Sequence, residues 1–467
     1  MSGVLAVLPR GEAIRNFVYS GALDAVAAHT DLTVASVVPN EDLRKLLEHR
    51  YGPIEELHQR TPRWLSGALR DTIDVAHGRW LWSEAVKERW RLRDLETAGA
   101  RGRWKHSARR AVARSLATPR GLAALDRGYE ALAGRIDVGD DVRGLLDRTA
   151  PDVVFNGSHV HGAEASPIIL AARQRGVRTA TFVFSWDNLT SQGRVIPRYD
   201  DFVVWTDAIR ADLLSMYPSI DPDRVWVTGT PQFDSHFNHD LAWTRELYSE
   251  VVGVDPGRPI VLYSTGMANH MPGEPWIVED IADRLATMPD SPQLVVRLYA
   301  KDRTGRFDDL VRRRADIAFP AVAWEPQWLT PLPDDTALWS NMLRHADVGI
   351  NIASTVSLEL CMFDRPVLNV AYNPPSVPRD EIDFARYYRF DHYRPIVESG
   401  AVQLISSPDD VRDSVADALQ EPGRFAVQRS ALLERFFGDM LDGRAGKRVA
   451  DVLCALADRA PSRRAGC

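Results

Sequence analysis

Short, almost wholly apolar runs alternate along the first half of the chain with longer segments in which apolar residues recur about every 3.6 positions. The apolar runs are residues 4–8, 32–38, 152–156, 179–184, 201–205 and 224–227, and one periodic segment covers residues 166–175. Continuous apolar runs bounded by turn residues are typical of strands buried on both faces, and strands that alternate with helices form parallel units. The first half is therefore predicted to be a doubly wound α/β sheet covered by helices.

The same alternation begins again near residue 258, after turn residues at 255–259. The strand candidates of this second set are residues 259–263, 293–298, 322–324, 347–352 and 365–370. We therefore predict two Rossmann-like domains, residues 1–250 and residues 251–467, with a last helix that closes the second domain. Ligands of such sheets bind at the carboxyl ends of the strands, so the cleft that the two domains are expected to face is the predicted active site.

Residues 60–114 differ from the rest of the first domain in charge and aromatic content. They contain fourteen Lys or Arg, six Asp or Glu, and five of the thirteen Trp of the chain. We interpret them as helices inserted into the first domain. Basic side chains beside Trp suit an anionic membrane surface, an anionic polymer or a phosphate-bearing acceptor. A solvated helical cap with packed Trp, or a surface that stacks RNA bases, would show the same composition.

Composition narrows the class of protein. The 467 residues carry a net charge of −7, which excludes a chain that coats nucleic acid through a general positive charge, and we predict no nucleic-acid partner. Three Cys are too few for a disulfide framework, and no run of 18 apolar residues occurs. The first residues have no basic leader or cleavage site. We therefore predict a cytoplasmic protein whose membrane contact, where it exists, is peripheral.

The segment 345–360 combines a buried strand, small hydroxyl residues and a helix. Its strand ends just before Ser354 and Thr355, where the helix is expected to begin. The free N–H groups and the positive dipole end of a helix start favour a diphosphate. Glu359 lies about one turn deeper and can accept hydrogen bonds from both hydroxyls of a ribose. The alternative interpretation is an ordinary capped helix with Glu359 in solvent.

Two other strand ends supply groups that suit the same diphosphate. Arg297 closes the strand 293–298, and Lys301 follows in the loop, so both cations can neutralise a leaving diphosphate. Ser264, Thr265 and Gly266 form a small-residue loop that a phosphate can approach closely. Cations exposed at a strand end and an ordinary connecting loop are the alternative interpretations.

The first domain offers three candidates for a general base on an acceptor hydroxyl. His159 and His161 follow the strand 152–156, and histidine titrates near neutral pH. Glu12, in the first strand–helix loop, is a rival base. A purely structural role is the alternative for each histidine.

Other residues of the first domain are candidates for holding an acceptor. Arg15 can hold an anion, Trp186 offers a stacking face, and Asp187 and Asn188 offer polar orientation. A tight turn packed by Trp186 is the alternative. The turn at 228–234 is interpreted either as a source of backbone amides for the donor or as a hinge.

Several cofactor motifs are absent from the sequence. The first strand is not followed by G-x-G-x-x-G, which disfavours NAD and FAD, and the chain contains neither G-x-x-x-x-G-K-[ST] nor H-E-x-x-H. The candidate segments contain no Asp-x-Asp to hold Mn²⁺. We therefore predict no cofactor and no metal, with helix dipoles and cations in the place of the metal.

These segments together resemble the GT-B glycosyltransferase superfamily, over roughly residues 150–455. The resemblance rests on the turn G-T-P-x-F-D at 229–234, on Arg297 with Lys301, on the tail segments 404–411 and 442–449, and on the run A-D-V-G-I-N-I-A-S-T-V-S-L-E-L-C-M-F-D-R-P-V-L-N-V at 346–370. It is nearest to bacterial surface-polysaccharide transferases and CDP-glycerol glycerophosphotransferases. The chain departs from the related transferases at Tyr299-Ala300, where they often have His-Pro.

The resemblance implies a GT-B fold, a nucleotide-diphosphate sugar held by the second domain and an acceptor held by the first. It implies that Ser354 and Thr355 hold donor phosphate, that Glu359 holds the ribose, and that Arg297 and Lys301 face the diphosphate. The expected activity is metal-independent transfer of a sugar to a glycan or lipid-linked acceptor of the cell envelope. The alternatives are transfer from a CDP-polyol to a polyol-phosphate polymer, a nucleotide-sugar 2-epimerase, and a non-catalytic nucleotide-sugar-binding protein.

Overall fold

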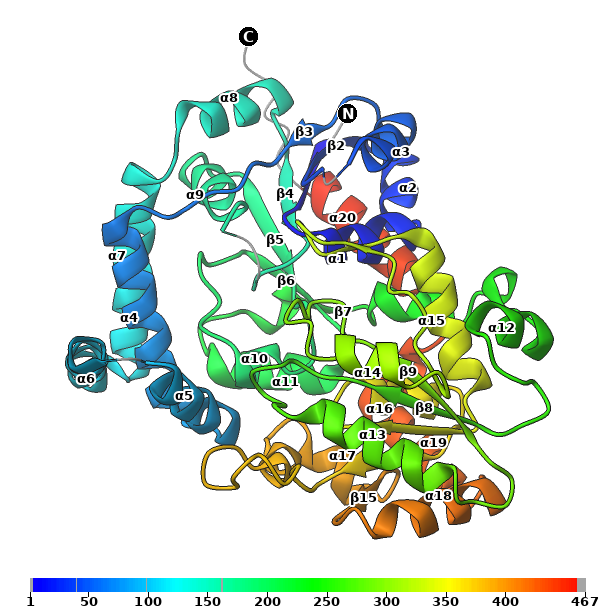
Figure 1. The fold of residues 1–467 in the computed structure, drawn as a ribbon. Coiled ribbons are helices and arrows are strands. Elements are labelled where there is room, and N and C mark those ends of the chain that lie inside the picture. The colour runs from blue at the N-terminus through cyan, green and yellow to red at the C-terminus, as the bar shows by residue number, and fades with distance from the viewer. Residues whose placement is uncertain (1–2, 39, 98, 161–162, 460–467) are drawn as a thin grey trace. The chain divides into compact units, whose positions relative to one another are not determined.

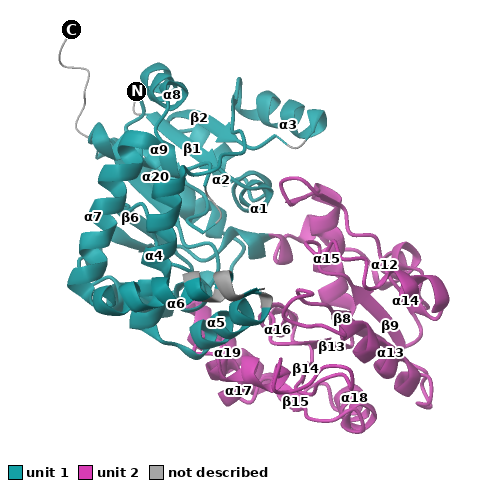
Figure 2. Ribbon diagram, turned by 60° about the vertical axis from the view of Figure 1, so that its left-hand side comes forward, with its two compact units in different colours: residues 1–234, 440–467 teal, residues 235–439 magenta. Residues whose placement is uncertain are grey.

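Two parallel β-sheets organise the chain, as Figure 1 shows for the computed structural model. The structure describes residues 3–38, 40–97, 99–160 and 163–459. The chain divides into two units, which Figure 2 colours separately: unit 1 contains residues 1–234 and 440–467, and unit 2 contains residues 235–439. The predicted α/β class, with two Rossmann-like halves, is confirmed.

Unit 1 is built on a seven-stranded parallel sheet with the strand order β3-β2-β1-β4-β5-β6-β7. Its strands are β1 Gly3–Leu8, β2 Asp31–Ser36, β3 Glu55–Glu56, β4 Val153–Asn156, β5 Arg178–Phe182, β6 Asp201–Val204 and β7 Val225–Val227. The central strands are buried along almost their whole length, which explains their continuous apolar runs. The chain order reverses between β1 and β4, which pair in register from Val4 with Val153 to Val7 with Asn156.

Unit 1 also contains helices and short turns. They are α1 Gly11–Ile14, the π-helix Arg15–Tyr19, α2 Ala22–Ala27, α3 Glu41–Tyr51, α4 Trp64–Leu81, α5 Glu84–Glu96, α6 Gly99–Leu116, α7 Pro119–Ile136, α8 Asp140–Thr149, α9 Ser166–Gln174, α10 Asn188–Ser191, α11 Asp207–Met216, the 3₁₀ turn Pro222–Arg224 and α20 Ala445–Asp458. Polar side chains at the helix starts accept backbone N–H groups, as Asn40 does from Leu43 and Ser83 from Val86.

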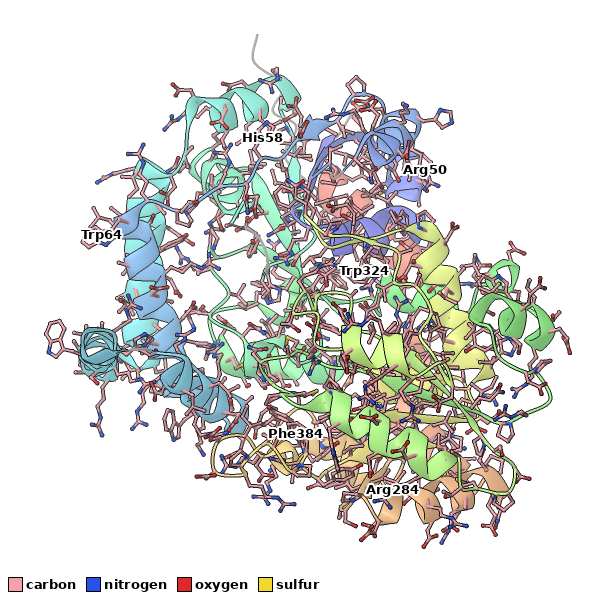
Figure 3. All side chains as sticks on the ribbon, in the orientation of Figure 1. Arg50, His58, Trp64, Arg284, Trp324 and Phe384 are labelled. Carbon is pink, nitrogen blue, oxygen red and sulfur yellow. The ribbon has the colours of Figure 1, made fainter. Side chains whose placement is uncertain are left out.

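The inserted segment consists of α4, α5 and α6, and α4 also packs on α7. Trp80 and Trp90 pack on a core that contains Val75, Ala76, Ala113 and Leu122. Trp64 lies at the start of α4 (Figure 3). Its side chain is 79% exposed, and that of Trp104 is 73% exposed. The insert thus combines a packed core with exposed indole rings. No helix in the described part of the chain is long and apolar enough to cross a membrane.

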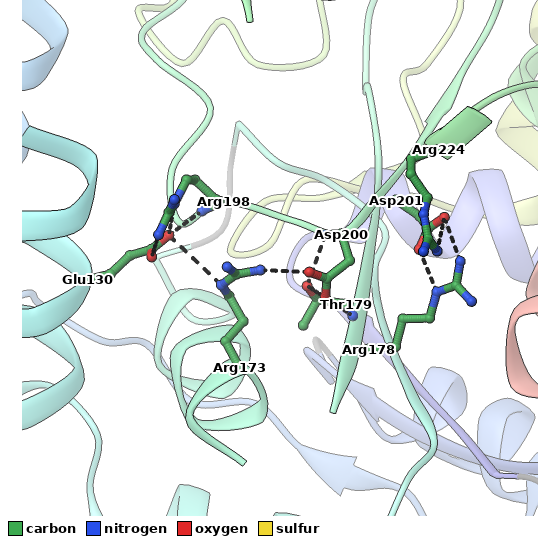
Figure 4. Close-up of polar contacts among 8 residues, drawn as sticks. All are labelled: Glu130, Arg173, Arg178, Thr179, Arg198, Asp200, Asp201 and Arg224. Atoms are coloured by element: carbon green, nitrogen blue, oxygen red, sulfur yellow. Dashed lines mark hydrogen bonds and ion pairs between the residues drawn. The ribbon is translucent and has the colours of Figure 1, made fainter. Parts of the chain in front are cut away.

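The amino ends of β5 and β6 are fixed by a network of paired charges (Figure 4). Arg178 donates to both oxygens of buried Asp201, at 2.6 and 3.0 Å. Arg173 on α9 donates to Asp200 at 3.0 Å, and Arg198 donates to Glu130 on α7 at 2.6 Å. Each arginine at this edge therefore has a carboxylate partner, which marks the network as structural.

Unit 2 is built on a six-stranded parallel sheet with the strand order β10-β9-β8-β13-β14-β15. Its strands are β8 Ile260–Ser264, β9 Gln293–Arg297, β10 Ile317–Ala318, β13 Val348–Asn351, β14 Val367–Val370 and β15 Gln403–Ile405. The predicted strand at 322–324 does not join this sheet. It overlaps β11 Trp324–Glu325, which pairs antiparallel with β12 Thr330–Pro331, because the intervening turn brings these two segments back on each other.

The helices and turns of unit 2 are the 3₁₀ turn His239–Leu241, α12 Arg245–Val252, α13 Glu274–Leu285, α14 Asp308–Arg313, α15 Pro333–His345, α16 Val356–Met362, the 3₁₀ turn Phe384–Arg389, α17 Arg394–Glu398, α18 Asp410–Gln420 and α19 Ala426–Phe437. The packing of α16 on β13 depends on Gly349. A Cβ atom there would lie 2.1 Å from Leu360 Cδ1, so only glycine allows this approach.

The predicted domain boundary at residue 250, and the assignment of the last helix to the second domain, are corrected by the structure. The units divide after Asp234, and the segment with α20 belongs to unit 1. There α20 packs on α2, β1 and β4. The Asp234 carboxylate accepts the backbone N–H groups of Ala445 and Gly446, at 3.0 and 2.7 Å, and so caps this helix. Burial raises the pKa of Asp234 to about 6.

Candidate functional site

Three neighbouring strands of unit 2 end at the same edge of the sheet. Ser264 at the end of β8 is in register with Arg297 at the end of β9 and with Asn351 at the end of β13. The chain order reverses between β8 and β13. The crevice beyond the carboxyl ends at such a reversal is the usual ligand position in open parallel sheets. The sequence candidates around 264, 297 and 354 therefore converge on this edge.

The turn after β13 leads directly into α16. Ala353 has a φ of +42°, which is uncommon for a residue with a side chain and marks a strained turn. The Ser354 N–H donates to Asn351 Oδ1 at 3.2 Å, and Ser354 Oγ accepts from the Val356 N–H at 3.3 Å. Thr355 is the residue before the helix and is half-buried. The Ser354 hydroxyl thus helps to start the helix, as the alternative interpretation expects.

A buried network of hydroxyl and amide groups lies beneath this turn. Asn351 Oδ1 also accepts hydrogen bonds from Ser357 Oγ and Asn369 Nδ2, both at 3.1 Å. The Tyr393 hydroxyl donates to Asn369 Oδ1 at 2.8 Å. These contacts join β13, β14, α16 and the start of α17, so the turn is held rigidly.

Glu359 is part of a hydrogen-bonded cluster. Its Oε1 atom accepts from Trp339 Nε1 at 3.0 Å and lies 3.0 Å from His236 Nε2. The Glu359 side chain is 12% exposed and that of His236 is 2% exposed. Within the described part of the chain, no partner is bonded to Glu359 Oε2. One carboxylate oxygen is thus fixed by protein, and the other remains for a ligand hydroxyl.

Arg297 is buried in an ion pair. Its Nη2 atom donates to both oxygens of Asp335, at 2.8 and 2.6 Å, and the two side chains are 8% and 4% exposed. Asp335 also accepts from Trp324 Nε1 at 2.7 Å. Arg297 Nη1 is buried and has no partner within the described residues. Asp335 therefore balances the charge and fixes the guanidinium group, while one N–H-bearing nitrogen remains for a ligand.

The loop Ser264–Gly266 is braced in a way that limits its predicted role. The Thr265 N–H donates to the Arg297 carbonyl at 3.0 Å, and the Gly266 N–H donates to both oxygens of Glu274 at 3.1 Å. These two amides are therefore not available to a phosphate, contrary to the expectation of close backbone approach. Gly266 instead packs closely against Met271, because a Cβ atom there would lie 2.0 Å from Met271 Sδ and the methionine side chain would have to move.

Glu274 under this loop gives unit 2 a predicted pH dependence. Burial raises its pKa from 4.5 to about 7, against the lowering effect of Arg306. A carboxyl group with a raised folded-state pKa stabilises the fold below its unfolded pKa and loses this contribution as the pH rises through the folded value. Relative to Glu274→Gln, the free energy of unfolding of the wild type should fall by about 3 kcal/mol between pH 4.5 and 7 in urea titrations.

Glu279 on the same helix provides the control. Its pKa is lowered, first by its hydrogen bond from Arg313, so it stays ionised across this pH range. Glu279→Gln should therefore show no such pH-dependent difference. If the difference in free energy of unfolding between the wild type and Glu274→Gln does not change with pH, the raised pKa of Glu274 is contradicted.

Lys301, the second cation predicted to face the diphosphate, is half-buried in the loop after β9.

Within residues 3–38, 40–97, 99–160 and 163–459, no group of three or more His, Cys, Asp or Glu is arranged to hold a metal ion. The sequence does contain one Asp-x-Asp run outside the candidate segments, Asp221-Pro222-Asp223, which forms an exposed turn before β7, where Asp221 accepts the Asp223 N–H.

The base candidates of unit 1 lie beside the strand reversal of its own sheet. Glu12 is buried in α1 beyond the end of β1, 3.8 Å from Arg10 Nε. His159 is buried beyond the end of β4, where its Nδ1 atom lies 3.2 Å from the Phe182 carbonyl oxygen. Glu12 thus lies in a helix rather than in the predicted loop, and the β1–β4 register brings it and the loop with His159 to the same edge. His161 lies outside the described residues.

The acceptor candidates of unit 1 are largely used by local structure. Arg15 donates to Gln232 Oε1 at 2.9 Å. Asp187 accepts from the hydroxyls of Ser185 and Ser191, at 2.5 and 2.7 Å, and Asn188 Oδ1 accepts the Ser185 N–H. Trp186 is 9% exposed, so its ring offers little of the predicted stacking face. These contacts match the alternative of a tight, packed turn.

The sequence did not predict three residues that contact Arg297 or Glu359, namely Asp335, Trp339 and His236. Asp335 and Trp339 are four positions apart on α15, so they share a helix face, and this spacing was a usable signal. His236 meets Glu359 from 123 positions away, a distance that no local pattern reveals.

Comparison with protein-family models and with curated protein sequences finds no match. Solved structures match the fold over nearly the whole chain. A UDP-GlcNAc 2-epimerase from Neisseria meningitidis, bound to UDP-GlcNAc, has a TM-score of 0.54 and 13% identity, with 97% of this chain and 100% of that chain covered. The fold is thereby decided. The chain has the GT-B fold.

Two further GT-B-fold structures extend the comparison. The UDP-GlcNAc 2-epimerase from Methanocaldococcus jannaschii has a TM-score of 0.51 and 14% identity, with 97% and 100% of the two chains covered. The structure of MnaA from S. aureus with UDP has a TM-score of 0.52 and 14% identity, with 99% of this chain and 99% of that chain covered. The GT-B fold of this chain agrees with the superfamily resemblance of its motifs.

Proposed function

We propose that the protein is a metal-independent glycosyltransferase that takes a sugar from a nucleotide-diphosphate sugar. The observation that carries the proposal is the carboxyl edge of the unit 2 sheet. Buried Arg297 Nη1 there has no partner within the described residues, and Glu359 is held by protein through one of its two oxygens. The guanidinium group of Arg297 suits a phosphate, and Glu359 Oε2 suits a ribose hydroxyl. The related structures include enzymes named for UDP-GlcNAc, which supports a nucleotide-sugar donor.

A transferase needs a second ligand, and unit 1 supports this requirement. Its sheet has a strand reversal of its own between β1 and β4, with Glu12 in α1 just beyond β1 and His159 in the loop after β4. In the proposed reaction, a base of unit 1 takes the proton of an acceptor hydroxyl as its oxygen bonds to the anomeric carbon. The bond from that carbon to the phosphate oxygen breaks, and the nucleoside diphosphate leaves with the electron pair, stabilised by Arg297 and Lys301. The proposed acceptor is a glycan or lipid-linked molecule of the cell envelope.

The proposal is tested by donor turnover with and without acceptor. The intact protein is incubated with UDP-, GDP- and TDP-sugars and with CDP-glycerol, and released nucleotide and new linkages are measured. Sugar transfer that requires an acceptor supports a glycosyltransferase, whereas transfer from CDP-glycerol alone replaces it by a polyol phosphotransferase. Binding of donor without any turnover would leave a non-catalytic binding protein. The base is the residue, Glu12, His159 or His161, whose change to Gln abolishes transfer but not donor binding.

A nucleotide-sugar 2-epimerase is the second candidate. It is favoured by the similarity to two UDP-GlcNAc 2-epimerases over 97% of the chain. An epimerase changes the sugar without an acceptor. Acceptor-independent appearance of the epimeric sugar in the same assay would therefore replace the transferase proposal.

We also propose a cytoplasmic location with peripheral attachment to an anionic membrane through the insert. The exposed indole rings of Trp64 and Trp104 supply apolar contact among basic residues. Changing both to Ser should weaken binding to phosphatidylglycerol vesicles about tenfold, because their apolar area is lost. Wild-type binding should also weaken with salt.

The matched control is Trp276→Ser in α13 of unit 2, where the ring is 36% exposed. Cosedimentation with vesicles measures all variants. Equal weakening by Trp276→Ser, or binding that does not respond to salt, would reject the insert as the membrane contact.

A further inference from the structure

A large cavity of unit 1 is lined by positive charge. Its volume is about 820 Å³, within the range of small-molecule sites. Six arginine side chains line it: Arg10, Arg60, Arg63, Arg70, Arg135 and Arg143. They come from the loop after β1, the segment leading into α4, α4 itself, α7 and α8. The chain therefore brings these cations together from positions far apart in sequence.

The charge of this cavity is not balanced by its own lining. Its only acidic lining residues within the described chain are Asp137 and Glu164. Asp137 Oδ1 accepts the backbone N–H of Arg63 at 3.2 Å. The amino edge of the same sheet differs, because each arginine there has a carboxylate beside it (Figure 4). An excess of arginine around a cavity favours an anionic ligand.

Two of the guanidinium groups stand out by their lack of partners. Arg60 pairs with Asp141, Arg143 with Asp140 at 3.0 Å, and Arg10 lies 3.8 Å from Glu12. By contrast, the side chains of Arg63 and Arg135 are exposed at the cavity lining and form no hydrogen bond or ion pair with any residue in the described ranges. These two are therefore placed to hold the anion.

Glu164 adds a group of opposite kind to the same cavity. It follows β4 in the chain, is 8% exposed, and forms no hydrogen bond or ion pair within the described residues. A carboxylate that is buried in a site for an anion needs a hydrogen-bond donor from the ligand, because an anionic neighbour alone would repel it. A ligand hydroxyl meets this need.

We propose that this cavity binds a phosphate ester that also carries hydroxyl groups, with Arg63 and Arg135 on the phosphate and Glu164 on a hydroxyl. Arginine forks match phosphate oxygens in pairs, and the volume accommodates a polyol or sugar beyond the phosphate. The inference rests on the proposed function in one respect, since it assigns this chemical class to the acceptor. The position of Val160 and Glu164 after β4 places the cavity at the carboxyl edge that carries His159.

The anion contact is tested by calorimetry of the intact protein with sn-glycerol 3-phosphate. Arg63→Gln/Arg135→Gln should weaken binding by about tenfold or more, because two charged hydrogen-bonding groups are lost. The matched control is Arg120→Gln/Arg127→Gln, since both residues are exposed on α7 and lie outside the lining. Absence of binding by the wild type, or equal weakening in both double variants, would overturn the proposal.

The hydroxyl contact is tested with propyl phosphate, which has the same length of chain but no hydroxyl. The wild type should prefer sn-glycerol 3-phosphate about tenfold. Glu164→Leu should lose this preference while binding propyl phosphate at least as well, because the carboxylate charge is gone, and Glu164→Gln should restore part of it. An unchanged preference in Glu164→Leu would remove Glu164 from the site.

Two further measurements separate the sources of phosphate and the two proposals. Binding to phosphatidylglycerol vesicles that is weakened by Arg63→Gln/Arg135→Gln, without binding of soluble sn-glycerol 3-phosphate, would identify a surface for lipid headgroups and reject the cavity site. Nucleotide binding is measured on the same samples and should be unchanged. A wild type that binds sn-glycerol 3-phosphate but no nucleotide would count against the proposed function. A wild type that binds nucleotide but no sn-glycerol 3-phosphate would count against this inference.

Discussion

Glu359→Gln should weaken nucleotide binding by about tenfold or more, while the melting temperature stays close to that of the wild type. In the wild type, Trp339 and His236 both contact Glu359 Oε1. The amide oxygen of the glutamine can still accept hydrogen bonds from both. The NH₂ group replaces the oxygen that is assigned to the ribose and cannot accept its hydroxyls. The lost charged hydrogen bond corresponds to about 1.5–3 kcal/mol. Calorimetric titration with the best-binding nucleoside diphosphate gives the dissociation constant.

Glu434→Gln is the control for this variant. Glu434 is exposed on α19 of the same unit. It should leave both affinity and stability unchanged. A Glu359→Gln protein that binds nucleotide as the wild type does would show that Glu359 only supports Trp339 and His236.

Arg297→Met should destabilise unit 2 by about 3–5 kcal/mol, because it leaves the Asp335 charge buried without its partner. Both side chains are less than a tenth exposed. The double variant Arg297→Met/Asp335→Asn should recover much of this loss, since no uncompensated charge remains. Its nucleotide affinity should stay low, because the guanidinium group assigned to the phosphate is absent. Urea denaturation and nucleotide titration measure the two effects separately.

Arg284→Met is the matched change outside the site. Arg284 pairs with Asp280 on α13, and the two side chains are 27% and 18% exposed. Loss of this more exposed pair should lower the free energy of unfolding by less than about 1 kcal/mol. Recovery of nucleotide binding in the double variant would rule out a role for Arg297 beyond the ion pair.

The sheets could be predicted because their central strands are buried on both faces. Such strands need continuous apolar runs, as in β1 and β4, and these runs stand out from the surrounding helices. The edge strands β3 and β10 contain two residues each and leave no comparable pattern. The place of α20 could not be predicted, because it depends on the cap that Asp234 supplies from 211 positions away.

The candidate site was predictable in position but only partly in its contacts. Parallel strands bring their carboxyl ends together, so residues after three apolar runs had to meet. The engagement of the Gly266 amide by Glu274, and the pairing of Arg297 with Asp335, depend on tertiary packing. In unit 1, the lining of the arginine cavity comes from separate helices and loops, and no single motif contains it.

The central claim is that a nucleoside diphosphate binds at the carboxyl edge of the unit 2 sheet. The most direct test is hydrogen exchange of the intact protein with and without the nucleotide, chosen from UDP, GDP, CDP and TDP, that stabilises it most. The account predicts slower exchange at residues 351–359 and 297–301, with little change in the insert. Protection confined to unit 1, or no protection at residues 351–359 under saturating nucleotide, would contradict it.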